Sequence, residues 1–232
     1  MTEMNDYKRK LALALFDIGA IQDKHQSPEG KGFKLKLHEI DPDALLSPVY
    51  LNFRTPDNPK PGPLTPDIIA VIGKELYKMA RLSKLRYSHV AGVPRAGNPL
   101  SEAFSETATT FGDYKIPVLE LVKEDSDGGR QIVEIIKGEC HKGERVLLVD
   151  DLITGAHSKL EAIKVLENGG MEVNDVLVLV DRQQGGPEQL KEKGYTFHAV
   201  FTFSELLDLY LNAGKMDQAT YDEINAYLAA NR

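Results

Sequence analysis

Two unbroken apolar runs, Val146–Val149 and Val176–Val180, constrain the fold of this chain more than any other feature. A strand with one solvent-exposed face alternates apolar and polar residues, whereas a strand buried on both faces is apolar throughout. Strands of the second kind belong to parallel sheets that are covered by helices on both sides. The two runs therefore predict an α/β fold with a buried parallel central sheet.

The segments around these runs alternate between strand and helix patterns. The predicted strands are 87–92, 117–122, 145–149, 173–180 and 196–202, and the predicted helices are 66–82, 98–111, 158–169, 187–194, 204–213 and 217–230. The stretch 124–131 is polar and is predicted to be a loop. This order predicts an α/β core over 66–232.

The first 65 residues have a different pattern. A helix is predicted over 5–20, a half-exposed strand over 33–37 and a second strand over 48–53. Five prolines in the segment from Thr55 to Pro66, the last being Pro66 itself, exclude regular structure over 55–65 and predict a surface loop. We expect a small N-terminal hood of a helix and strands over 1–65, within a single domain spanning 1–232.

Composition limits the classes of binding partner that we expect for this protein. The formal net charge of −7 repels a phosphate backbone, so nucleic acid is not an expected partner. No apolar stretch is long enough to span a bilayer, and we expect a cytoplasmic protein without a membrane partner. Cys140 is the only cysteine, which excludes an intrachain disulfide framework.

The residues with the clearest chemistry follow the first apolar run. Asp150 and Asp151 end the strand, and Thr154–Ser158 leads into a helix. Ligands of open parallel sheets bind at the carboxyl ends of strands, and a helix N-terminus offers N–H groups to a phosphate. The two carboxylates would repel that phosphate but suit vicinal ribose hydroxyls. The alternative is an ordinary strand–loop–helix connection with solvated acids.

This segment resembles the phosphoribosyl-diphosphate signature of type I phosphoribosyltransferases. The shared pattern is four apolar residues, two acids, two apolar residues, Thr and a loop of small residues. The resemblance implies that the diphosphate co-substrate is bound by seven residues of this segment, Asp150, Asp151, Thr154, Gly155, Ala156, His157 and Ser158, with Mg²⁺ held at Asp150 and Asp151. The family usually has Gly where this chain has Ala156, which implies an altered loop backbone.

Within that family the chain resembles orotate phosphoribosyltransferase over most of its length. Four further segments match its motifs in order, namely 13–22, 33–36, 47–52 and 92–100, and a fifth, 181–186, follows them. The resemblance implies a homodimer. About ten residues between Lys36 and Ser47 replace a very short link in the family, which implies a remodelled rim there.

The same resemblance assigns the base and diphosphate contacts. Lys36 and Arg182 would bind the orotate carboxylate and ring edge, Tyr50 would lie against the ring, and Arg95 would lie beside the diphosphate. Orotate is a flat anion, which suits a lysine charge and a planar guanidinium. The alternatives are an exposed strand lysine at 36, packing of Tyr50 and a structural ion pair of Arg182 with Asp181.

The chain departs from the family at its mobile catalytic loop. The family pattern Arg-Lys-x-x-Lys-Asp-His/Tyr-Gly corresponds to residues 122–129. Lys123 and Asp127 match and are implied to be catalytic, with Arg130 as a further cation from a shifted position. The family's Arg, second Lys and His/Tyr are replaced by three residues that carry no positive charge, Val122, Ser126 and Gly128.

Three functions remain open from the sequence. The first is Mg²⁺-dependent transfer of ribose 5-phosphate to orotate in pyrimidine nucleotide synthesis. The second is a weak or silent relative that binds a nucleotide or phosphoribosyl diphosphate as a regulatory ligand. The third is a transferase for another base. Lys36, Tyr50 and Arg182 favour the first, and the altered loop favours the second.

Overall fold

The structure is a computed structural model that describes residues 4–35, 42–111, 114–126 and 129–231, with only the backbone at 125–126, 129–131, 133–134 and 136–137. Contacts divide the chain into two compact units. The central unit is Thr65–Phe203, and the terminal unit combines Met1–Leu64 with Ser204–Arg232. The prediction of one domain over the whole chain stays a prediction.

A six-stranded sheet of order β5-β4-β3-β6-β7-β8 forms the central unit. Its strands are β3 (His89–Gly92), β4 (Val118–Ser126), β5 (Gly129–Lys137), β6 (Arg145–Ile153), β7 (Glu172–Asp181) and β8 (Thr196–Thr202). Five of them run parallel, and β5 pairs antiparallel with β4 at the edge. The predicted α/β fold with a buried parallel sheet is confirmed.

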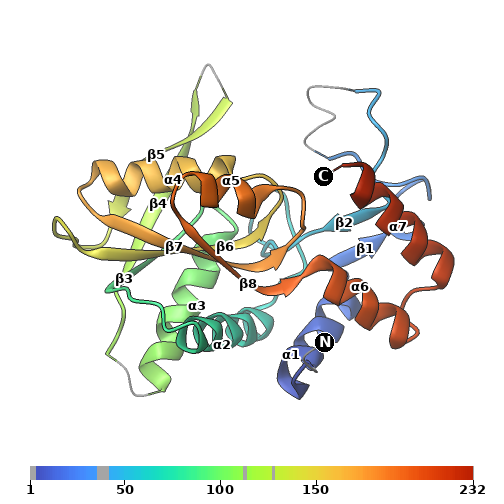
Figure 1. The fold of residues 1–232 in the computed structure, drawn as a ribbon, viewed down its shortest axis with the longest axis horizontal. Coiled ribbons are helices and arrows are strands. Elements are labelled where there is room, and N and C mark those ends of the chain that lie inside the picture. Colours follow the sequence, from blue (N-terminus) through green and yellow to red (C-terminus); the bar gives the residue numbers. More distant parts are fainter. Residues whose placement is uncertain (1–3, 36–41, 112–113, 127–128, 232) are drawn as a thin grey trace. The chain divides into compact units, whose positions relative to one another are not determined.

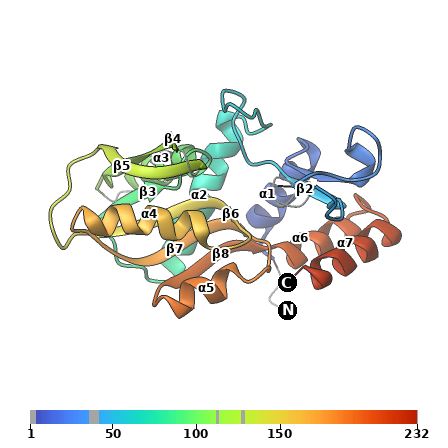
Figure 2. The same cartoon turned by 90° about the horizontal axis from the view of Figure 1, so that it is seen from above.

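Helices cover both faces of this sheet, as Figures 1 and 2 show. On one face lie α2 (Pro66–Leu82) and α3 (Gly97–Thr110), and on the other lie α4 (His157–Asn168) and α5 (Gly186–Glu192). Val146 and Leu148 of β6 belong to the apolar core under α4, together with Ile163 and Leu166 of that helix. Burial of β6 from both sides explains its continuous apolar run.

One sequence prediction for this unit is wrong. The described residues of the polar stretch 124–131 are not a loop, because β4 continues to Ser126 and β5 begins at Gly129. The two strands pair from Glu120–Lys137 to Ser126–Gly129, with two register shifts between. Cross-strand hydrogen bonds satisfy the backbone of both strands, and this pairing decides the structure of a segment whose polarity resembles that of a loop.

The terminal unit joins the two ends of the chain. It contains α1 (Asp6–Asp17), β1 (Ile21–Asp23), a 3₁₀ turn η1 (Lys24–Gln26), β2 (Val49–Leu51), α6 (Phe203–Asn212) and α7 (Gln218–Ala230). The antiparallel pair β1–β2 confirms the strand predicted over 48–53, whereas β1 was not predicted. The described residues of the predicted strand 33–37 form only an isolated bridge, between Phe33 and Ser47.

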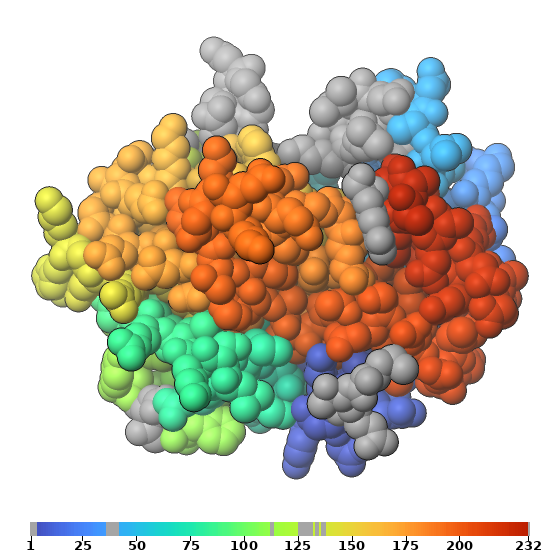
Figure 3. Space-filling view, viewed as in Figure 1, coloured from blue at the N-terminus to red at the C-terminus, as the bar shows by residue number. Residues whose placement is uncertain are grey.

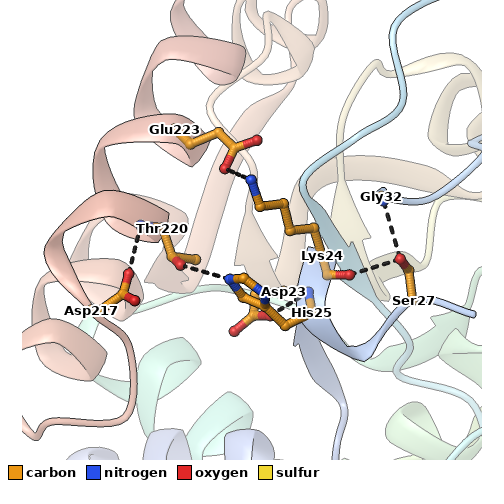
Figure 4. A network of polar contacts seen from close by, with 8 residues as sticks. All are labelled: Asp23, Lys24, His25, Ser27, Gly32, Asp217, Thr220 and Glu223. Atoms are coloured by element: carbon orange, nitrogen blue, oxygen red, sulfur yellow. Dashed lines mark hydrogen bonds and ion pairs between the residues drawn. The ribbon is translucent and has the colours of Figure 1, made fainter. Parts of the chain in front are cut away.

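Polar contacts within the terminal unit connect residues about 200 positions apart. The buried Tyr210 hydroxyl donates to the Ala12 carbonyl at 2.9 Å, and Figure 3 shows the N-terminal segment in blue against the C-terminal helices in red. Lys24 of η1 forms an ion pair with Glu223 of α7 (Figure 4). The C-terminal helices therefore stabilise the N-terminal segment. Within the described residues, no helix combines the length and apolarity that a membrane span requires.

Candidate functional site

Three connections leave the same edge of the central sheet. In the parallel pairs, Gly92 at the end of β3 lies opposite Val149, and Ile153 at the end of β6 lies opposite Asp181. The carboxyl ends of β3, β6 and β7 therefore meet at one edge, which is where ligands of open α/β sheets bind. The residues predicted from 92–100, 150–158 and 181–186 are brought together at this edge.

Asp150 is held inside the protein by two partners. Its Oδ2 lies 2.6 Å from the Lys159 ammonium, and its Oδ1 accepts a hydrogen bond from the Asp151 N–H at 2.9 Å. Only 4% of Asp150 and 4% of Lys159 are exposed. The Lys159 ammonium also donates to the Leu152 carbonyl at 2.5 Å. The negative charge of Asp150 is thus compensated by groups of the protein itself.

Asp151 has a different environment. It is half-buried, and its Oδ1 accepts the Leu152 N–H at 2.7 Å. Burial, and after it the neighbouring charge of Asp150, raise the pKa of Asp151 to about 8. A carboxyl that is costly to ionise gains from a cation or hydroxyl donor, so Asp151 is suited to bind a ligand.

The loop 154–158 leads into α4 without a side-chain cap. Among the described residues, the N–H groups of His157, Ser158 and Lys159 have no acceptor, as expected for the first turn of a helix. These donors and the hydroxyl of Thr154 give the loop the chemistry of a phosphate site. The His157 side chain is exposed and lies 3.8 Å from Glu161.

Two neighbouring residues shape this loop. Ala156 has φ −87°, a conformation open to any residue, so its replacement of the family's glycine causes no strain. Its N–H donates to Oε1 of Gln189 on α5 at 2.9 Å. Gly186, where α5 begins, lies against Ile153 and Thr154 so closely that a Cβ would collide with both.

The two arginines of this edge differ in exposure. Arg95 is exposed in the turn between β3 and α3, where the Pro94–Arg95 peptide bond is cis. Arg182 follows β7 and is buried. Its backbone N–H donates to the Ile153 carbonyl at 3.0 Å. Asp181 beside it accepts the Gln183 N–H at 2.7 Å, and burial raises the pKa of Asp181.

The residues implied to be catalytic belong to the β4–β5 hairpin. Lys123 lies in β4 opposite Ile132, and Arg130 lies in β5 opposite Asp125. The Arg130 side chain and the whole of Asp127 lie outside the described part of the chain. The strands, rather than an irregular loop, therefore carry Lys123 and Arg130.

The residues implied to bind the base belong to different units. Arg182 is in the central unit, and Tyr50 is on β2 of the terminal unit. The Tyr50 ring stacks on Phe33 with 5.3 Å between ring centroids, and its hydroxyl accepts a hydrogen bond from Arg54 at 2.9 Å. Lys36 lies outside the described residues.

The structure adds Lys159 and Gln189, which the sequence analysis did not identify. Lysine in the first turn of a helix is unfavourable with the helix dipole, and this was the signal available for Lys159. Gln189 gave no signal, because its contact depends on how α5 packs on the loop.

The acidic pair is compatible with Mg²⁺. Among the described residues no group of three or more Asp, Glu, His or Cys could hold a metal ion. Mg²⁺, however, is commonly bound by one or two carboxylates, substrate phosphates and water. Asp151, with no ion pair among the described residues, fits such a site.

Comparisons with known proteins agree with this geometry. The model of the phosphoribosyl transferase domain family matches residues 65–205. Uridine 5′-monophosphate synthase of Bos taurus is 30% identical over 195 residues, which are 81% of this chain and 38% of that protein. Orotate phosphoribosyltransferase of Saccharolobus solfataricus is 30% identical over 187 residues, 80% of this chain and 86% of that protein. The structure of Leishmania donovani UMP synthase matches with a TM-score of 0.72 and 26% identity, covering 96% of this chain and 42% of that chain. The chain thus spans less than half the length of these two synthases.

Proposed function

Because the chain belongs to the phosphoribosyl transferase family, and within it to the orotate phosphoribosyltransferases, we propose that it transfers ribose 5-phosphate from phosphoribosyl diphosphate to orotate. The products are orotidine 5′-phosphate and pyrophosphate. The observation that carries the proposal is the end of β6, where an acidic pair is followed by a loop with three N–H groups that lack an acceptor among the described residues.

The phosphoribosyl group is held by residues of the central unit. The N–H groups of 157–159 and the hydroxyls of Thr154 and Ser158 bind the 5′-phosphate. Asp151 of the acidic pair faces the ribose hydroxyls and would hold Mg²⁺, whose charge would offset that of the departing pyrophosphate. Arg95 adds a positive charge beside that leaving group.

The base and the leaving group involve the remaining predicted residues. Arg182 and Lys36 bind the anionic edge of orotate, and Tyr50 covers its ring, in keeping with the sequence motifs that contain them. Lys123 and Arg130 stabilise the pyrophosphate, and Asp127 is the third residue that the loop motif implies to be catalytic. The hairpin of one subunit serves the site of its partner in a homodimer.

A turnover assay with a matched variant tests this function. Purified protein with phosphoribosyl diphosphate, Mg²⁺ and orotate should release pyrophosphate, and adenine, uracil and hypoxanthine in place of orotate should not support release. Asp151→Asn should lower kcat/KM about 100-fold or more, because it removes the carboxylate that contacts the ribose. Asp57→Asn, at an exposed position of the terminal unit, is the control and should be unchanged. Equal activity of the Asp151 variant and the wild type, or release with another base only, would contradict the proposal.

The altered hairpin supports a second candidate, a regulatory binder with little turnover. Val122, Ser126 and Gly128 stand where the family has Arg, Lys and His or Tyr, and Glu124, Asp125 and Asp127 add negative charge. Tight binding of phosphoribosyl diphosphate without pyrophosphate release from any base would favour this candidate.

A further inference from the structure

The two adjacent acids at the end of β6 have different partners. Side chains of successive strand residues point to opposite faces. Asp150 lies an even number of residues from Val146 and Leu148, so it is on the same face of β6 as these two, which pack in the core under α4. The Asp150 carboxyl is accordingly found against α4, in contact with Lys159. Asp151 follows directly and is half-exposed, so the two carboxylates have different surroundings.

The position of Lys159 is costly unless it has a specific partner. A lysine loses hydration when it is buried, and a positive charge in the first turn of a helix opposes the helix dipole. The Lys159 side chain is only 4% exposed and is the third residue of α4. The contacts with Asp150 at 2.6 Å and the Leu152 carbonyl at 2.5 Å compensate this cost.

Both oxygens of the buried Asp150 carboxylate already have a partner within the fold. One of its oxygens is paired with the Lys159 ammonium, and the other accepts the Asp151 N–H. That N–H bond also fixes the backbone at the residue whose carboxyl is available. Lys159 additionally contacts Leu152, so it connects α4 to the strand end on both sides of Asp151.

We propose that Lys159 is a positioning residue, which retains Asp150 inside the fold and thereby leaves Asp151 alone to contact the ribose hydroxyls. This inference rests on the proposed function and divides the roles of the acidic pair. The Lys159 side chain acts through Asp150 and does not touch the ligand. Without Lys159, the charge of Asp150 is uncompensated, repels the bound phosphate and disturbs the backbone at Asp151.

Calorimetric titration with ribose 5-phosphate in the absence of metal tests the proposal. Lys159→Met should weaken binding about tenfold, because one uncompensated negative charge then lies beside the phosphate loop. The double variant Asp150→Asn/Lys159→Met removes both charges and should regain most of that loss. Lys164→Met removes an exposed lysine from the same helix and should bind like the wild type.

The rescue separates positioning from direct contact. A purely structural loss of the ion pair would lower the unfolding temperature without this pattern of affinities, so thermal unfolding is measured in parallel. If the double variant binds as weakly as Lys159→Met, or if Lys159→Met binds like the wild type, the inference is overturned. If Lys159→Met does not fold, the double variant decides alone, since the inference requires its affinity to lie within about threefold of wild type. Absence of wild-type binding would overturn the proposed function together with the inference.

Discussion

At the scale of single residues, the site depends on how each polar group is compensated. Asp150 and Asp151 are neighbours in sequence, but the first is ion-paired in the interior and the second is half-buried with a raised pKa. A group whose ionisation is costly in the free protein stores free energy that a ligand can release. The two acids are therefore expected to respond differently to substitution.

The pH dependence of stability should show that the pKa of Asp151 is raised in the folded protein. Because its folded pKa of about 8 lies above the unfolded value of 3.8, the folded protein binds the extra proton between these values. The free energy of unfolding therefore falls as pH rises towards 8. Asp151→Asn should abolish this fall and stabilise the protein by roughly 1–3 kcal/mol more at pH 8.5 than at pH 5. Urea unfolding at both pH values measures this, with exposed Asp57→Asn as the control; a parallel pH dependence of variant and wild type would contradict it.

Gln189 should tune phosphate affinity from outside the loop. Its Oε1 accepts the Ala156 N–H, and Gln189→Glu places a negative charge at the same position. Repulsion by this charge should raise the KM for phosphoribosyl diphosphate about tenfold with little change in kcat. Lys191→Gln changes the net charge of α5 equally at an exposed position and should have a much smaller effect. The prediction fails if both variants change KM alike.

At the scale of elements, the β4–β5 hairpin is the part most altered from the family pattern. Its two strands are paired antiparallel, with register shifts between Glu120 and Leu121 and between Val122 and Lys123. Paired strands position side chains more rigidly than an irregular loop does. The chemistry of the hairpin therefore depends on which charges it carries.

Restoring the family's charges on the hairpin should increase turnover. The triple variant Val122→Arg/Ser126→Lys/Gly128→His returns donors for the departing pyrophosphate, and each such donor is typically worth 10²–10³ in rate. We expect kcat to rise about tenfold or more while orotate affinity changes little. The matched control Val122→Gln/Ser126→Gln/Gly128→Asn has the same pattern without the cations. A wild-type kcat already near about 10 s⁻¹, or an equal gain in the control, would contradict this reading.

At the scale of the whole molecule, one of the two compact units is built from segments that are far apart in the sequence. The terminal unit requires both ends of the chain, and its contacts include the ion pair between Lys24 and Glu223 and the Tyr210–Ala12 hydrogen bond. The central unit provides the phosphate loop and the hairpin.

Assembly is the prediction that belongs to this scale. We expect light scattering at micromolar concentration to give twice the monomer mass, because closed oligomers are most often two-fold symmetric. If the hairpin serves the partner's site, mixing the inactive variants Asp151→Asn and Lys123→Ala should restore about a quarter of wild-type activity through mixed dimers. The unmixed variants are the controls. A monomer at all concentrations would contradict the dimer, and a dimer without recovery would contradict the shared hairpin.

The sequence by itself determined the five parallel strands of the sheet, most element boundaries and the strand–loop–helix at 150–158. The bounds of α2 and β8 agree with the predicted ones because proline at the helix start and apolar periodicity are local signals. The strand–loop–helix at Asp150–Ser158 was equally visible, since its function depends on residues that are adjacent in the chain. These features follow from short-range preferences and from burial of contiguous residues.

Only the tertiary structure decided what depends on contacts between distant segments. Residues 124–126 and 129–131 proved to belong to paired strands, because cross-strand pairing is not specified by local propensity. The division of the acidic pair depends on Lys159 reaching back to β6, and the Ala156 contact depends on α5 lying over the loop. The grouping of the C-terminal helices with the N-terminal segment likewise depends on contacts across about 200 residues. Such contacts depend on packing geometry, which no local pattern of residues specifies.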